Sequence, residues 1–77
     1  MTMTLAELRH LYRGNELVEA IIEPINDGVW GVEFRHVNGG FMPLTDSRGE
    51  ACHYDDLDYA SKCAMAVGFR QVRVEAK

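Results

Sequence analysis

The chain has 77 residues and a formal net charge of −4 at pH 7, and 47% of its residues are hydrophobic. A chain of this length supports one domain at most, with a single small core. The negative charge has the wrong sign for a protein that binds by neutralising phosphates, so the composition disfavours nucleic acid as a partner. No apolar run approaches the roughly 18 residues that a membrane-spanning helix needs, so we expect no membrane contact.

The first residues contain neither a long apolar stretch nor a small-residue cleavage site, so they do not read as a secretory signal and we expect a cytoplasmic protein. The two cysteines, Cys52 and Cys63, are then expected to stay reduced, because disulfides are rare in that compartment. A core this small rarely supplies more than roughly 3–5 kcal/mol, and self-association is a common supplement in such domains. We therefore expect the chain to self-associate.

The first predicted element is a helix over residues 4–13. Thr4 and Glu7 have the spacing of a capping box, in which each side chain satisfies a free backbone N–H at the start of a helix. Gly14 is expected to end the helix in the left-handed conformation. The apolar residues that recur at three- and four-residue spacing along it are Leu5, Leu8, Leu11 and Tyr12.

Three strands are predicted next, over residues 17–25, 29–37 and 41–46. They are separated by turns at residues 26–28 (NDG) and 38–40 (NGG), whose glycines and asparagines suit tight hairpins. Each strand alternates between apolar and polar residues, as a half-buried strand does. The residues expected to face the core are Val18, Ala20, Ile22, Trp30, Val32, Phe34, Met42 and Leu44.

A second helix begins at Asp55 or Asp56 and ends at Gly68, after a turn near residues 47–50 and the short segment ACHY. Four residues are too few for a periodic signal, so the sequence does not decide whether ACHY forms a strand. The last segment, residues 71–76, alternates again and predicts a final strand with Val72 and Val74 inward. The buried stripe expected on the second helix consists of Leu57, Ala60, Ala64 and Val67.

These elements predict a single α+β domain over residues 1–77, in the order α-β-β-β-(β)-α-β. Short connections favour antiparallel neighbours, so we expect an antiparallel sheet of four to five strands with two helices packed on one face. The order of the strands within the sheet stays open.

Five stretches of the chain carry a family resemblance, and they span nearly its whole length: residues 5–17, 27–34, 44–50, 55–60 and 67–75. In these stretches the sequence resembles small, mostly uncharacterised proteins of plasmids and integrative elements of proteobacteria, often labelled replication- or partition-associated. The resemblance implies an accessory protein of a mobile element, and it implies no catalytic residues.

Cys52, His53 and Cys63 are the candidates for metal or thiol chemistry. A structural zinc site needs four ligands, whereas Cys52 and His53 are adjacent and point to opposite faces if ACHY is a strand. Cys63 lies in the second half of its helix beside the buried stripe, where a thiol acts as a small apolar filler. We therefore expect no metal, no cofactor and no catalytic residue.

Three aspartates surround the start of the second helix, Asp55, Asp56 and Asp58. They lack the glycine and terminal glutamate of a calcium loop, and carboxylates at this position cap a helix and complement its dipole. Double-stranded RNA-binding domains share the order helix, three strands, helix, but they place a basic helix start against phosphates. The aspartates therefore argue against that function.

The open face of the predicted sheet carries both apolar residues and arginines. A contiguous apolar patch on a small domain indicates a partner or a second copy of the chain, and an unpaired edge can recruit another strand. Glu33 and Glu75 lie among the arginines, which favours a solvated face over a nucleic-acid surface. The residues predicted to form the interaction surface are Ile21, Val29, Arg35, Val37, Phe41 and Arg73.

The first functional hypothesis is therefore a non-enzymatic interaction module, homodimeric and accessory to a mobile element. The second is a weak nucleic-acid-binding protein of replication or partition that uses the arginine face. The third is a small metal- or thiol-dependent protein built around Cys52, His53 and Cys63. A domain of this size has little room for an enclosed catalytic pocket unless a dimer interface supplies one.

Overall fold

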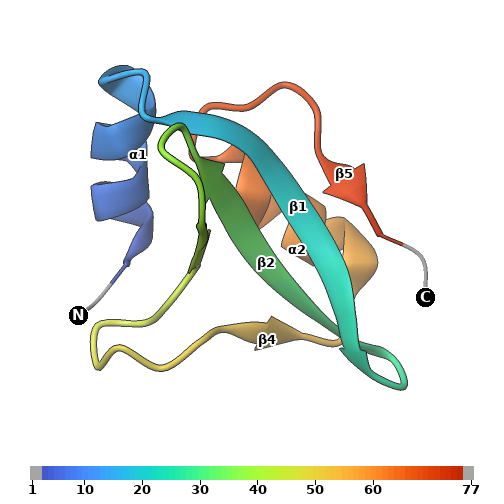
Figure 1. Cartoon of the computed structure of the whole chain (residues 1–77). Helices are drawn as coiled ribbons and strands as arrows, with labels where there is room; N and C mark the ends of the chain where they lie inside the picture. The colour runs from blue at the N-terminus through green and yellow to red at the C-terminus, as the bar shows by residue number, and fades with distance from the viewer. Residues whose placement is uncertain (1–2, 76–77) are drawn as a thin grey trace.

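The computed structural model describes residues 3–75, and it forms an α+β fold with a five-stranded sheet (Figure 1). The order predicted from the sequence is confirmed, and ACHY contains a true strand. The elements are α1 (Leu5–Arg13), β1 (Leu17–Asn26), β2 (Val29–His36), β3 (Phe41–Pro43), β4 (His53–Tyr54), α2 (Leu57–Met65) and β5 (Arg73–Val74). Residue 76, which the predicted last strand included, lies outside the described residues.

The centre of the sheet is the antiparallel hairpin of β1 and β2, joined by the tight turn at Asp27 and Gly28, where Gly28 adopts φ 72°. The strand order is β3-β2-β1-β5, and β4 pairs with β2 further along the edge that β3 also occupies. β5 runs parallel to β1, whereas the sequence predicted only antiparallel neighbours. Because α2 carries the chain across the sheet between β4 and β5, the two strands that it joins run in the same direction.

The core lies between one face of the sheet and the two helices. Ala60 and Ala64 of α2 are fully buried, and their small side chains let the helix lie close to β1 and β2 (Figure 1). Leu8 of α1 is fully buried in the same cluster, so both helices contribute to one core, as predicted. The sheet residues of this cluster are Leu17, Ala20, Ile22, Val32 and Phe34.

Two predicted core residues of the sheet are exposed. Val18 is 44% exposed because it is the extra residue of a β-bulge, between the pairs Leu17–His36 and Glu19–Arg35. Val74 is 45% exposed because β5 is short and forms the edge of the sheet. Both corrections concern positions where the regular alternation of the strand is interrupted or ends.

The ends of α1 differ from the sequence prediction. Thr4 is the N-cap residue, but its side chain makes no capping hydrogen bond. Gly14 stays at φ −83°, and Asn15 adopts the left-handed conformation instead, at φ 60°. Asparagine tolerates this region better than most residues, so the chain reverses one residue later than predicted.

α2 starts as predicted, because Asp56 is its N-cap and its Oδ1 accepts a hydrogen bond of 2.9 Å from the Asp58 N–H. After α2 the chain turns at Gly68, which adopts φ 142°. A side chain there would place its Cβ 2.5 Å from the ring of Tyr12. Gly68 thereby allows Phe69 to pack against the rings of Tyr12 and Phe34, at centroid distances of 4.8 and 5.9 Å.

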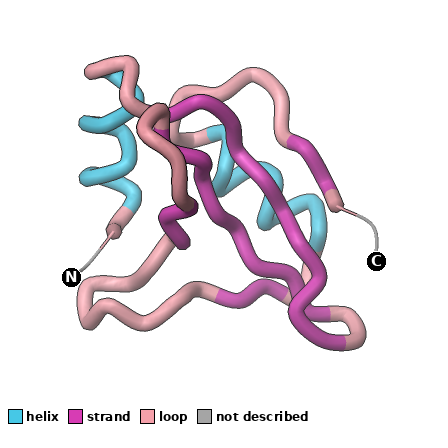
Figure 2. The backbone as a smooth tube through the Cα atoms, in the orientation of Figure 1, coloured by secondary structure: helices cyan, strands magenta, loops and turns pink. Residues whose placement is uncertain are grey.

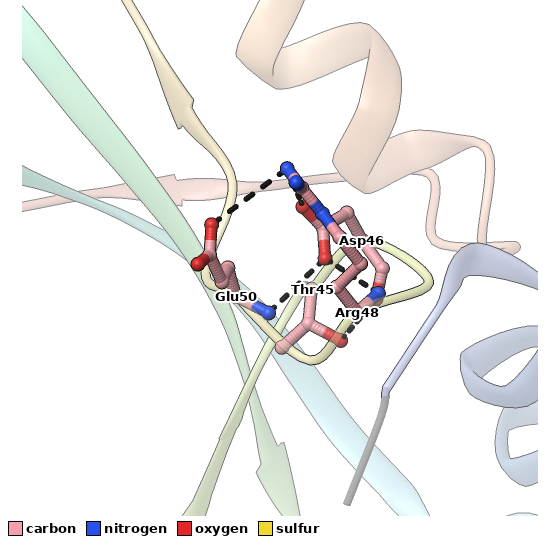
Figure 3. A network of polar contacts seen from close by, with 4 residues as sticks. All are labelled: Thr45, Asp46, Arg48 and Glu50. Carbon is pink, nitrogen blue, oxygen red and sulfur yellow. Dashed lines mark hydrogen bonds and ion pairs between the residues drawn. The ribbon is translucent and has the colours of Figure 1, made fainter.

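The predicted turn near residues 47–50 is held by Asp46, whose Oδ1 accepts hydrogen bonds from the N–H groups of Arg48 and Glu50 (Figure 3). Arg48 also forms exposed ion pairs with the carboxylates of Asp46 and Glu50. Thr45 is buried, and its Oγ1 accepts a hydrogen bond from the Met3 N–H. The loop is therefore satisfied internally and tied to the chain just before α1.

Candidate interaction site

The arginines predicted to lie on the open face of the sheet are neutralised there. Arg73 donates from Nη2 to Glu19 Oε1 at 2.8 Å, and its Nη1 lies 3.2 Å from Glu75 Oε2. Arg35 Nε lies 3.6 Å from the same Glu19 oxygen. The hydrogen bond from Arg73 lowers the pKa of Glu19, and Glu19 in turn raises the pKa of Arg73. The two arginines thus converge on one carboxylate instead of facing a ligand.

The sequence predicted that Ile21 belongs to an exposed apolar patch. In the structure its side chain is only 1% exposed, so it does not. It points away from the main core, and its register neighbours are Glu33 on β2 and Arg73 on β5. Long charged side chains cover apolar surface with their methylene groups while their heads stay in water. Alternation alone places Ile21 on the open face but does not reveal this cover.

The open face of the sheet also carries an acidic cluster, formed by Glu23, Glu33 and Glu75. Burial raises the pKa of Glu33, and the carboxylates of Glu23 and Glu75 raise it further. Within residues 3–75 no group of three or more His, Cys, Asp or Glu side chains is arranged to hold a metal ion. The open face is therefore divided into an arginine–glutamate network and a like-charged cluster.

The remaining predicted surface residues lie at the two ends of the sheet. Val37 and Phe41 are 56% and 55% exposed and flank the turn between β2 and β3, where the His36 N–H donates to the Gly40 carbonyl. Val29 is half-buried and pairs with Asn26 at the opposite end of β2. The predicted surface is thus not continuous, and Val37 and Phe41 form its exposed apolar part.

The two cysteines lie near the hydroxyl of Tyr54, which was not predicted as a site residue from the sequence. Cys52 and Cys63 are free, half-buried and packed against the core, whereas His53 is exposed. Burial raises the pKa of the Tyr54 hydroxyl, and the neighbouring thiols of Cys63 and Cys52 raise it further. The sequence signal was the two-residue spacing of Cys52 and Tyr54, which places them on one face of a strand.

A hollow lies beside β1, and we name it the β1 groove. It has a volume of about 710 Å³ and is lined by Val18, Glu19 and Ala20 of β1, by residues 69–73 and by Tyr12. Figure 2 shows the cause, because the loop after α2 arches away from β1 before the chain joins the sheet as β5. This groove was not predicted from the sequence, because it depends on where β5 begins to pair.

Comparison of the chain with protein-family models, with curated proteins and with solved structures found no match. Within the described part of the chain, no helix is both long and apolar enough to cross a membrane.

Proposed function

We propose that the protein is a non-enzymatic interaction module that forms a homodimer through Val37 and Phe41. These two side chains are exposed by more than half and flank one turn, so they offer adjacent apolar surface at one end of the sheet. Exposed apolar side chains that lie together favour association, since burying them removes apolar surface from water. This observation carries the proposal.

The contact is made by side chains and not by pairing of β3 edges. β3 is an edge strand of the sheet and has only three residues, Phe41–Pro43. Because proline has no N–H, Pro43 cannot donate to an added strand. The edge is thus a poor template, whereas the Phe41 ring is available for packing.

The proposed role is that of an accessory protein of a mobile element, and this part rests on the sequence resemblance alone. The proposed location is the cytoplasm, where thiols such as the free Cys52 and Cys63 stay reduced. A structural role of the two cysteines has more support than thiol chemistry, since Cys52 and Cys63 pack against the core beside Tyr54.

Nucleic-acid binding would use Arg35, Arg48, Arg70 and Arg73. It has less support, because Arg35 and Arg73 both engage Glu19 and Arg48 pairs with Asp46 and Glu50.

A substitution at the proposed contact tests the dimer. Phe41→Glu introduces a charge into the apolar contact and is expected to give a monomer of 8.7 kDa, while the unchanged chain has twice that mass in light scattering at high concentration. Met65→Glu is the matched control, because Met65 is also exposed, at 44%, but lies on α2. A monomeric unchanged chain across a wide concentration range, or an equal loss of dimer in both variants, would contradict the proposal.

A further inference from the structure

A second apolar surface lies on the flank of α1 that faces away from α2. The opposite flank is held against the end of α2 and the chain after it, because Arg9 donates from Nε to the Ala66 carbonyl at 2.9 Å and Tyr12 packs on Phe69. The free flank contains a hollow of about 320 Å³ whose surface is almost entirely apolar. We name it the α1 hollow, and its lining residues are Met3, Ala6, Glu7, His10 and Leu11.

α1 runs beside the segment that contains β3, and the two are tied together near both ends of the helix. The Met3 N–H donates to Thr45 Oγ1 at 2.7 Å, and the Thr45 N–H donates to the Met3 carbonyl at 2.9 Å. Just beyond the other end of the helix, the Val37 N–H donates to the Glu16 carbonyl at 2.8 Å. Residues 37–45 include β3, so the α1 hollow opens on the same edge of the molecule as Phe41 (Figures 1 and 2).

The Phe41 ring is an exposed aromatic group that is not engaged by its own chain. Phe41 and Tyr59 are the aromatic residues of the described chain that are more than half exposed. Tyr59 packs edge-on against Tyr54 at a centroid distance of 5.4 Å, whereas within residues 3–75 Phe41 contacts no other aromatic ring. An apolar cavity of roughly 150 Å³ is enough to take a benzene ring. The α1 hollow therefore has room for a phenylalanine ring, and its lining does not include the Phe41 of the same chain.

We propose that in the homodimer the Phe41 ring of each protomer enters the α1 hollow of the other. A two-fold contact is reciprocal, so the inserting side chain and the receiving hollow must lie in one interface, and here both lie on the β3 edge. The ring then packs on Met3, Ala6 and Leu11, and both apolar surfaces leave water together. The inference rests on the proposed homodimer and adds the surface that receives Phe41.

The test is an isotope-filtered NOE experiment on an equal mixture of ¹³C-labelled and unlabelled full chains at high concentration. We expect NOEs between the Phe41 ring protons of one protomer and the methyl groups of Met3, Ala6 and Leu11 of the other.

A substitution in the hollow gives a second readout. Ala6→Glu places a carboxylate where the ring packs, so we expect the Kd of the dimer to rise about tenfold or more. Because Ala6 is exposed and glutamate is a good helix former, the monomer should keep its helical content in circular dichroism. Met65→Glu is the matched control, since Met65 is exposed on α2, and it should leave the Kd unchanged.

The homodimer and the occupied hollow can fail separately. A chain that is monomeric at every concentration would contradict both. A dimer that Phe41→Glu abolishes but that Ala6→Glu and Met65→Glu leave equally tight would keep the homodimer and overturn insertion into the α1 hollow. Filtered NOEs that join Phe41 only to Val37 or Phe41 of the other protomer would do the same. NOEs from Tyr59 or Met65 to the hollow would assign it to α2 of the second copy, against the inference.

Discussion

At the scale of single residues, Gly68 has the strongest steric requirement that the structure shows. Its φ of 142° is accessible to glycine, and a Cβ would contact the Tyr12 ring at 2.5 Å. Gly68→Ala therefore combines backbone strain with displacement of an aromatic ring that also packs on Phe69. We expect it to lower the free energy of unfolding by about 2–3 kcal/mol in urea titrations.

Gly39 provides the control for this prediction. Its φ is 96°, but a Cβ there would meet no atom within 4 Å. Gly39→Ala thus introduces backbone strain without a clash and is expected to cost about 1 kcal/mol. Equal destabilisation by the two substitutions would show that the contact with Tyr12 is not important for stability.

Two glutamates of the open face are expected to respond to pH in opposite directions. The pKa of Glu19 lies below its ordinary value of 4.5, so its ionised form stabilises the fold above that pH, and the contribution is lost as pH falls through the folded-state pKa. The pKa of Glu33 lies above 4.5, so its ionised form destabilises the fold once pH rises through the folded-state value.

The matched substitutions are Glu19→Gln and Glu33→Gln, measured by urea unfolding at pH 7 and at pH 3. At pH 7, Glu19→Gln should destabilise by about 0.5 kcal/mol, a small value because the ion pair with Arg73 is partly exposed. Glu33→Gln should stabilise at pH 7, and both differences should shrink at pH 3. Shifts of the same sign for both variants at pH 7 would refute this assignment.

At the scale of elements, local residues were sufficient to predict the β1–β2 hairpin and the start of α2. Asp27 and Gly28 specify a tight turn, and Asp56 specifies a cap, through chemistry within a few residues. The direction of β5 was not predictable in this way. It depends on the path of α2 across the sheet, which is a long-range property of the chain.

For the candidate surface too, features set by neighbouring residues were predictable from the sequence, and features set by distant residues were not. Alternation placed Arg35 and Arg73 correctly outside the core, but it did not show that both meet Glu19, which is 54 residues from Arg73 along the chain. Ile21 was assigned to the exposed surface because its cover also comes from distant residues. The β1 groove was missed for the same reason, since its two walls are separated in sequence.

The cap of α2 gives a prediction at this scale. Asp56→Ala removes the oxygen that accepts from the Asp58 N–H, so the first turn loses one satisfied backbone donor. We expect a loss of about 1 kcal/mol in the free energy of unfolding, measured by thermal or urea denaturation. Asp55→Ala, one residue before the cap, should change stability much less, and an equal effect would indicate that general charge and not the cap is responsible.

At the scale of the whole molecule, the arginines of the open face, Arg35 and Arg73, are engaged by Glu19 of the same chain. Val37 and Phe41 mark one end of the sheet and carry the proposed homodimer. The β1 groove lies along the β1 side of the central hairpin, and its lining does not include Val37 or Phe41.

The homodimer is tested most directly by the change of ¹H–¹⁵N amide shifts of the full chain on dilution. We expect concentration-dependent shifts at residues 36–41, together with a rise in rotational correlation time at high concentration. Phe41→Glu should show the dilute-state shifts at every concentration. Amide shifts and correlation time that do not change across the concentration range, or changes confined to α2, would contradict the claim.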